Sequence, residues 1–191
     1  VMLGLASLDL LGIQGAIVQM VSHGLVAAGL FLMGGMIYER CHTRELAAYG
    51  GLGKGLPGDS VFFLILTLAS VGLPTTSGFT GEFLVLLGAF NAAWKPAAVA
   101  IPLGAAVLAV TGVVLGALYM LWFAQRFLFG AERVPHGPVA DLNLREKSIL
   151  AILVAAVFWL GLFPDSAMKR TELAAREYQE LVAGARVPAA T

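Results

Sequence analysis

Apolar residues along the chain fall into four long blocks separated by shorter polar segments. The blocks cover residues 10–37, 61–90, 97–124 and 148–163. A helix that crosses a bilayer needs roughly 20 residues, with a range of about 17 to 25, so the first and third blocks are each long enough. The fourth block is short, and we expect residues 142–147 to lengthen it, because charged side chains near a helix end can reach the interface. The pattern predicts an all-α integral membrane protein with about four transmembrane helices.

The second block is too long for one straight helix. Its thirty residues would extend about 45 Å, whereas the hydrocarbon core of a bilayer is about 30 Å thick. We therefore predict two half-helices, about 61–73 and 79–91, joined by an irregular link that is packed in protein or lines a wet cavity. A simple proline-kinked helix without a functional role is the alternative. The helix-breaking residues that we assign to the link are Gly72, Pro74, Thr75, Ser77, Gly78 and Gly81.

Glu82 is the main candidate for chemistry. It lies one turn into the second predicted half-helix, and seven of the eight residues that follow it are apolar. An acid at the centre of a membrane helix costs about 2.5–3.5 kcal/mol on insertion scales, so such acids are functional candidates. Because its protonation depends on burial and on nearby charge, Glu82 is predicted to be a switchable proton or cation site. The alternative is an acid at the membrane surface, which needs no partner.

His23 is the second candidate, since it lies near the middle of the first block. Histidine titrates near neutral pH, and two ionisable groups at depth on neighbouring helices indicate a proton relay. The alternative is a hydrogen-bonded core histidine. Further polar residues could hold a water path or satisfy backbone groups that the break leaves free. These residues are Gln19, Ser22, Thr67, Ser70, Thr76 and Thr80.

Composition supports the membrane assignment and excludes other classes. The chain has 191 residues, of which 59% are hydrophobic and only 13% charged, and its mean hydropathy is +0.85. Soluble domains have about 25% charged residues. The formal net charge of zero gives no indication of nucleic-acid binding, and no nucleotide loop, metal cluster or catalytic triad is recognisable. The chain opens on VMLGLASLD without an initiator methionine, so we expect a piece of a longer protein in which residues 1–5 end a further helix.

Basic residues predict the orientation of the bundle. The loops over residues 38–60 and 125–147 carry seven lysines and arginines, and four spans would place both loops on one side. The positive-inside rule then puts these loops in the cytoplasm. The basic residues of the tail, Lys169, Arg170, Arg176 and Arg186, conflict with this orientation. Residues 171–182 of that tail have the pattern of a surface helix.

Two stretches resemble a known family. HGLVAAGLFLMGGMIYERCHTRELAAYGGL, from His23 to Leu52, and GLPTTSGFTGEFLVLLGAF, from Gly72 to Phe90, resemble the antiporter-like subunit M (chain 4 in mitochondria) of NADH–quinone oxidoreductase, respiratory complex I. The most specific part is YERxHTR. The GFxGEF pattern is shared more widely, including with subunits of multisubunit cation/proton antiporters. The pair Thr75-Thr76 stands where this family commonly has glycine.

The resemblance implies a fourteen-helix bundle made of two inverted five-helix repeats, each with a broken helix. Residues 1–164 would be the C-terminal part of this proton-translocating domain, and residues 165–191 an extramembrane tail. His23 and Glu82 match the family's proton-path residues, with Glu82 on the broken helix where the path approaches the outer side. The lysine partners of that path would lie in earlier helices.

The resemblance also implies what surrounds the chain. It would be a non-redox subunit without independent catalytic activity, in the inner membrane of a bacterium, beside other membrane subunits of complex I, including antiporter-like ones, and lipid. It would bind no cofactor, and NADH, FMN, iron–sulfur clusters and quinone would belong to other subunits. The alternatives are a subunit of a multisubunit cation/proton antiporter and a structural or assembly segment.

Overall fold

The structure, a computed structural model, describes residues 1–94, 101–131, 133 and 139–185. The expectations for Arg186 and for residues 134–138 of the second basic loop fall outside these ranges. The described elements are α1 (Met2–Ala6), α2 (Leu10–Cys41), a 3₁₀ turn η1 (Leu46–Ala48), α3 (Leu52–Gly55), α4 (Pro57–Ser70), α5 (Ser77–Trp94), α6 (Leu103–Leu128), α7 (Leu144–Leu162) and α8 (Asp165–Ala185). The predicted all-α class is confirmed.

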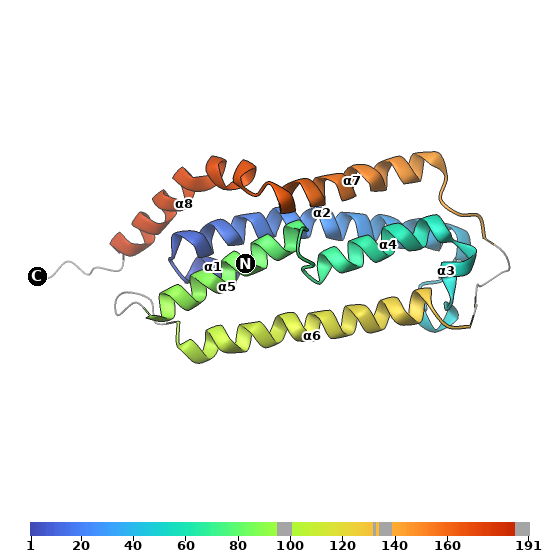
Figure 1. Cartoon of the computed structure of the whole chain (residues 1–191), viewed down its shortest axis with the longest axis horizontal. Helices are drawn as coiled ribbons and strands as arrows, with labels where there is room; N and C mark the ends of the chain where they lie inside the picture. Colours follow the sequence, from blue (N-terminus) through green and yellow to red (C-terminus); the bar gives the residue numbers. More distant parts are fainter. Residues whose placement is uncertain (95–100, 132, 134–138, 186–191) are drawn as a thin grey trace, which may run out of the picture.

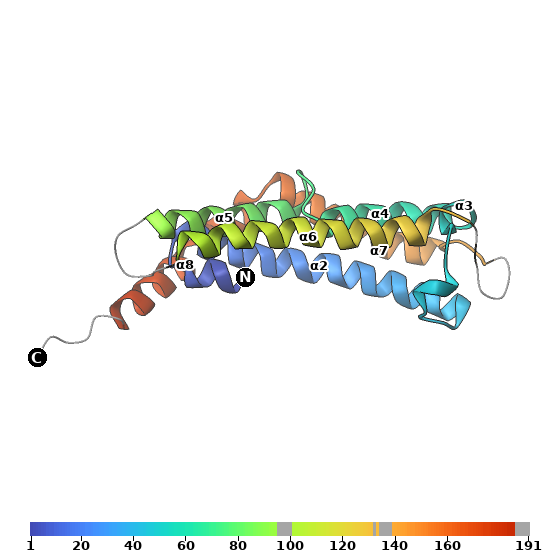
Figure 2. The same cartoon turned by 90° about the horizontal axis from the view of Figure 1, so that it is seen from below.

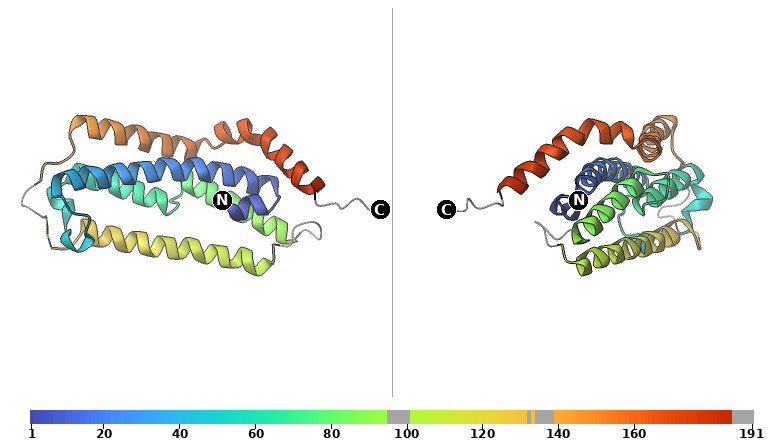
Figure 3. Two further views of the ribbon diagram at one scale, coloured as in Figure 1. Left: turned by 180° about the vertical axis from the view of Figure 1, so that it is seen from behind. Right: turned by 60° about the vertical axis from the view of Figure 1, so that its left-hand side comes forward.

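Helix α2 is the central helix of the bundle. It contacts α1, α4, α5, α7 and α8 along its length, whereas α6 contacts α3, α4 and α5 (Figure 1). Viewed from below, α6 lies across both α4 and α5 (Figure 2). Viewed from behind, α2 runs in front of the same two helices (Figure 3). Helices α4 and α5 therefore contact both long helices, α2 and α6.

The predicted broken helix is present, but the break lies earlier than expected, at residues 71–76 instead of 74–78. Helices α4 and α5 follow one another along α2 and are separated by residues 71–76, which we call the link (Figure 1). Helix α4 starts earlier than predicted, at Pro57, because proline is well suited to the first helical position. The structure places Ser77, Gly78 and Gly81 in the first turns of α5 rather than in the link.

Close packing of α2 against α5 explains one use of these small residues. Gly88 of α5 faces Gly12 of α2 so closely that a Cβ at Gly88 would collide with the backbone of Gly12. Small residues of this kind let membrane helices approach, since lipid supplies no hydrophobic force between them. Glycine in α5 therefore serves helix contact as much as helix breaking.

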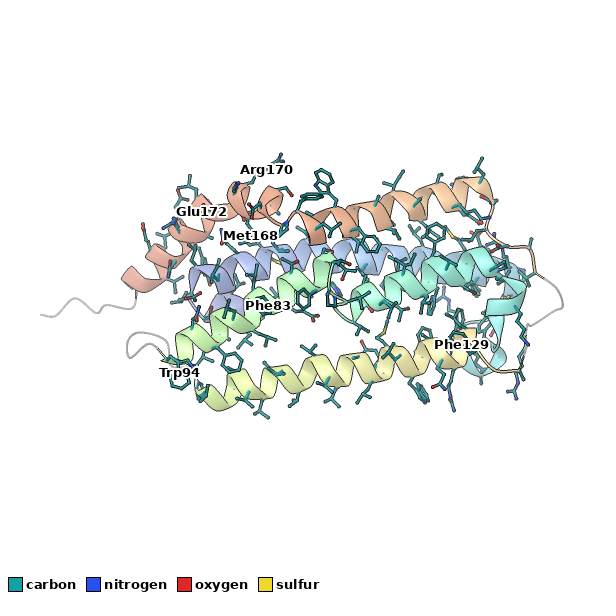
Figure 4. The ribbon with its side chains drawn as sticks, in the orientation of Figure 1. Phe83, Trp94, Phe129, Met168, Arg170 and Glu172 are labelled. Carbon is teal, nitrogen blue, oxygen red and sulfur yellow. The ribbon has the colours of Figure 1, made fainter. Side chains whose placement is uncertain are left out.

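By length and apolar character, α2 and α6 can each cross a membrane. Helices α7 and α8 add one further span if they are counted as a bent pair, with 68° between them at the break. Helix α4 is a shorter apolar helix and reaches the length of a span only together with α5. Trp94 and Phe129, which are 75% and 60% exposed, lie near opposite ends of the bundle (Figure 4). Aromatic side chains are typical of the two membrane interfaces.

The two predicted basic loops meet at one end of the bundle. Gly50 and Arg133 form an isolated antiparallel bridge between them. At the same end, Nη2 of Arg40 on α2 donates to Oε2 of Glu146 on α7 over 2.6 Å, and both side chains are mostly buried. We call this end of the bundle the charged end. Arg40 is the first of the two arginines in the YERxHTR pattern, so part of that pattern serves to join α2 to α7.

The largest core cluster of the described residues lies toward the charged end and joins five helices, α2, α3, α4, α6 and α7. Phe63 of α4 packs its ring 4.8 Å from that of Phe127 and 5.5 Å from that of Phe123, both on α6. Aromatic pairs at such separations add to the stabilisation from apolar burial. The buried members of the cluster are Met33, Ile37, Cys41, Tyr49, Leu52, Leu56, Phe63, Leu66, Ala124, Phe127, Leu128, Leu142 and Leu150.

The first turn of α4 is capped from a distant part of the chain. Oδ2 of Asp141 accepts from the backbone N–H of Gly58 at 2.9 Å, and Oδ1 accepts from that of Asp59 at 3.0 Å. Partial burial raises the pKa of Asp141, but hydrogen bonds from the backbone N–H groups of Leu142, Gly58 and Asp59, with the charge of Lys147, outweigh burial and lower it below the usual value. The ionised carboxylate therefore stabilises the folded chain.

We expect Asp141→Ala to lower the free energy of unfolding of the full-length subunit in detergent by about 1–3 kcal/mol at pH 7, because hydrogen bonds to a charged group are lost. The stabilisation is present above the ordinary aspartate pKa of about 3.9 and is lost as the pH falls through the lowered folded value. Thermal unfolding at several pH values measures the difference. Asp165→Ala, which removes an exposed ion pair with Lys169, is the control and should change little. An unchanged Asp141→Ala protein would contradict the capping role.

Helix α7 packs directly against the link. A Cβ at Gly161 would collide with the carbonyl oxygen of Thr75 and would lie 2.7 Å from its carbonyl carbon. Thr80 of α5 donates to the carbonyl oxygen of Gly161 at 3.4 Å, which joins the start of α5 to the same point. The absence of a side chain at Gly161 therefore allows α7 to cover the irregular backbone of the link.

We expect Gly161→Ala to destabilise the full-length subunit by about 1–3 kcal/mol, the usual cost of forcing extra atoms into a packed site. Thermal unfolding in detergent measures this effect. Gly112→Ala in α6 is the matched control, because no atom lies within 4 Å of the position its methyl group would take. Equal stability of the two variants would show that α7 does not need its close approach to the link.

Candidate functional site

Glu82 lies at the junction of the link and α5. Its side chain is half-buried in this chain, and its carboxyl group turns back over the link. A Cβ at Gly72 would lie 2.8 Å from Oε2 of Glu82, so only glycine leaves room for the carboxyl group in this position. Gly72 also has φ +79°, in the region that favours glycine. One residue of the link thus provides both the turn and the space for the acid.

Gln19 of α2 is the nearest polar partner of Glu82. Its Nε2 donates to Oε1 of Glu82 over 3.5 Å, a long hydrogen bond. Its own Oε1 is buried and has no hydrogen-bond partner within the described part of the chain. A Cβ at Gly81 would lie 2.9 Å from the Cα of Gln19, so α2 and α5 are in direct contact here. Gln19, a candidate for the polar path, therefore lies beside Glu82.

A second polar contact joins α2 to α5 beside the link. The hydroxyl oxygens of Ser22 and Ser77 lie 2.7 Å apart, and both residues are almost fully buried. Either hydroxyl can donate in this pair, so its direction can reverse without loss of the hydrogen bond. A reversible hydroxyl pair is a suitable element of a proton path. Equally, it fixes α2 against the first turn of α5.

The remaining threonines and Ser70 bond mainly to nearby backbone. Thr76 donates to the carbonyl oxygen of Leu73, and Ser70 to that of Thr67, each at 2.7 Å. These contacts follow the alternative in which hydroxyl groups satisfy backbone freed by the break. The exception is Thr67, which is fully buried and whose Oγ1 has no hydrogen-bond partner in the described residues. Buried polar atoms of this kind commonly bind ordered water.

His23 lies apart from this group. It is exposed in this chain and lines a groove of about 730 Å³ between α2 and α6. Ser70 and Tyr119 line the same groove. In the described residues His23 makes no hydrogen bond to Glu82 or Gln19. The structure separates His23 from Gln19, because Gln19 turns toward α5 while His23 turns toward the groove.

The link contains one strained residue. Thr75 has φ +87°, which costs a residue other than glycine about 1–3 kcal/mol. This conformation explains why glycine suits the position where the sequence departs from the resembling family. Pro74 precedes it and has no backbone N–H to satisfy, which suits an unwound segment. The link is thus a defined irregular structure and more than a bend in one continuous helix.

The charged end contains a buried acid that sequence reasoning assigned to a loop. Asp59 is only 2% exposed, and its Oδ2 has no hydrogen-bond partner in the described part of the chain. Asp59 precedes the second apolar block by two residues, so a search for acids next to apolar blocks would have found it. The partners of Asp141 and Glu146 come from distant segments and could not be read from local patterns.

Helix α8 closes the opposite end of the bundle. Nε2 of Gln14 donates to the carbonyl oxygen of Met168 at 3.2 Å, and Nε2 of Gln179 donates to that of Leu8 at 2.6 Å. Met168 lies on the side of α8 toward α2, whereas Arg170 lies on the outer side (Figure 4). The surface helix predicted for residues 171–182 is present as part of α8.

Comparison with known proteins places the chain in a family of membrane subunits. Residues 1–109 match the family model described as NADH:quinone oxidoreductase/Mrp antiporter, transmembrane. NADH-quinone oxidoreductase subunit M of Rhodobacter capsulatus is 45% identical over 168 residues, which are 86% of this chain and 31% of the relative. NADH-ubiquinone oxidoreductase chain 4 of Marchantia polymorpha is 42% identical over 167 residues, 86% of this chain and 32% of the relative. The chain thus spans about a third of the length of these relatives.

Solved structures give the same result for the fold. A chain of respiratory complex I from Thermus thermophilus with bound NADH superposes with a TM-score of 0.81 at 35% identity, covering 94% of this chain and 36% of that one. A chain of the Mrp complex from Dietzia superposes with a TM-score of 0.75 at 21% identity, covering 91% of this chain and 39% of that one, which is a likeness of fold alone. The chain is a multi-pass membrane protein that belongs to the NADH:quinone oxidoreductase/Mrp antiporter membrane family, within which its similarity to subunit M and chain 4 covers most of its length.

Proposed function

We propose that this chain is part of a proton-translocating membrane subunit of an NADH–quinone oxidoreductase, and that Glu82 carries the proton. The observation that supports this most is the position of the Glu82 carboxyl group over the link, hydrogen-bonded to Gln19 and next to Gly72. An acid held at a break in a membrane helix has irregular backbone and polar side chains beside it instead of lipid. Such an acid can gain and lose a proton during a transport cycle.

The path would run through the polar contacts between α2 and α5. Gln19 orients the carboxyl group of Glu82, and the reversible Ser22–Ser77 pair lies beside the link. His23 would serve the path from the groove side, through groups supplied by parts of the protein outside this chain. Residues 1–164 would form the C-terminal part of the translocating domain, and residues 165–191 an extramembrane tail.

Redox chemistry would take place on other subunits. Nucleotide, flavin, iron–sulfur clusters and quinone would be bound there, and this chain would act as a non-redox subunit of the translocase. Its partners would be neighbouring membrane subunits, including antiporter-like ones, and lipid. The charged end would face the cytoplasm, since positive residues favour that side in an inner membrane.

We expect Glu82→Gln, introduced into the full-length subunit of the assembled complex, to lower the rate of proton pumping by about tenfold or more, the usual range for losing a positioned proton-transfer group. The amide keeps the shape of the side chain and its hydrogen bond to Gln19, so assembly should be nearly unchanged. Proton uptake and quinone reduction in proteoliposomes measure the effect. Glu177→Gln on α8 is the matched control, because Glu177 is exposed. Normal pumping by an assembled Glu82→Gln complex would refute the role of Glu82.

A cation/proton antiporter subunit is the second candidate, because the fold likeness extends to the Mrp complex. In that case transport by the assembled protein would depend on sodium and would proceed without quinone reduction. A third possibility, a purely structural segment, predicts that Glu82→Gln changes stability and leaves transport intact.

A further inference from the structure

The broken helix contains a second buried acid, and one of its carboxyl oxygens has no hydrogen-bond partner among the described residues. Asp59 lies in the first turn of α4, at the charged end, and is 2% exposed. Its Oδ2 is enclosed and accepts no hydrogen bond from any described residue. Unsatisfied buried polar atoms are rare in folded proteins and usually indicate a bound water, an ion or a function.

The neighbouring charged groups are already engaged with other partners. Asp141 accepts from two backbone N–H groups of α4, and Glu146 pairs with Arg40 and accepts from the backbone N–H of Asn143. Lys147 extends over the start of α4, where a Cβ at Gly58 would lie 3.1 Å from its Cε. These partnered groups keep their charges, whereas no cation among the described residues is hydrogen-bonded to Asp59.

The charges around Asp59 are opposed. Burial already favours the neutral form of Asp59; the carboxylates of Asp141 and Glu146 favour it further, and the guanidinium of Arg40 favours the ionised form. Because Oδ2 of Asp59 makes no hydrogen bond, a proton can bind there or leave without breaking one. Of the three acids in this group, Asp59 is therefore the one whose protonation can change at the least structural cost.

Helix α4 leads from Asp59 toward the link. Thr67, whose hydroxyl is the other fully buried polar group of α4 without a partner, lies two turns further along. Eight residues of helix correspond to about 12 Å. Both groups offer polar atoms to bound water, and beyond them lies the Glu82 carboxyl group. Near each of its ends, α4 thus has a polar side-chain atom without a hydrogen-bond partner among the described residues.

We propose that Asp59 is a proton-binding group at the charged end of α4, which exchanges protons with the water on that side and passes them toward the polar interior at the link. This inference rests on the proposed function and adds an entry group to the predicted Glu82 site. It assigns to the charged end a transport role besides the structural role of the Arg40–Glu146 pair and the Asp141 cap.

The test is Asp59→Asn in the full-length subunit of the assembled complex, compared with Asp59→Glu. The asparagine has nearly the same shape but cannot exchange a proton, so we expect the rate of coupled proton uptake to fall by about tenfold or more. The glutamate keeps the carboxyl group and should restore most of the rate. Glu45→Gln is the matched control, since Glu45 is an exposed acid at the same end of the bundle. An assembled Asp59→Asn complex that pumps at the wild-type rate would overturn the proposal.

If the Asp59→Asn complex does not assemble, chemical modification of the wild-type complex tests the proposal instead. Dicyclohexylcarbodiimide reacts with protonated carboxyl groups in apolar surroundings, and mass spectrometry locates the adduct. The proposal predicts modification of Asp59 at pH 7 that declines as the pH is raised, with no modification of Asp141. Absence of the Asp59 adduct would overturn the proposal.

The failure of this inference can be distinguished from the failure of the proposed function. If Glu82→Gln stops pumping and Asp59→Asn does not, the proposed function stands and only this inference fails. Normal pumping by both variants would contradict the proposed function as well.

Discussion

The requirement that dominates this structure is the satisfaction of backbone groups in a solvent without water. A helix satisfies its own backbone. The link at residues 71–76 bonds four of its N–H groups to nearby carbonyl oxygens, but its other backbone groups lie outside the helical pattern, and each free group in hydrocarbon costs several kcal/mol. Helix α7 contacts the link at Thr75 and Thr76, and α2 contacts the start of α5 beside it, whereas residues 73–75 are exposed in this chain. Gly161 lets α7 approach the carbonyl groups of the link, and the Ser22–Ser77 pair joins α2 to the first turn of α5. The polar surroundings of Glu82 follow from this packing.

Much of the fold could be predicted from the sequence, because membrane solvent imposes simple rules on helix length and apolar pattern. The four blocks, the break within the second block and the common side of the two basic loops all follow from such local rules. The ends of α4 and α5 were less predictable. Glycine and serine after the break were assigned to the link, whereas close helix contact requires small residues inside α5 as well. The same residue types serve both purposes, so composition could not separate them.

Parts of the candidate site could be predicted and others could not, for a related reason. The position of Glu82 after a break depends on nearby sequence and was predicted, whereas its contact with Gln19 depends on the pairing of α2 with α5. The direction of His23 depends on how α2 is rotated in the bundle, which its nearly uniform apolar surface does not determine. The engagement of Asp141 with α4 and of Arg40 with Glu146 depends on contacts between residues 82 to 106 positions apart. Such pairs are visible only once the helices are placed.

Helix α7 connects two distant parts of the structure. Glu146 in its first turn is bound to Arg40, and Gly161 near its other end lies against the link. They are fifteen positions apart in the sequence, which corresponds to about 22 Å of continuous helix. A helix of this length is stiff along its axis. It therefore links the charged end, where Asp59 lies, to the backbone of the link beside Glu82. A sliding movement of α7 at either contact would be transmitted to the other.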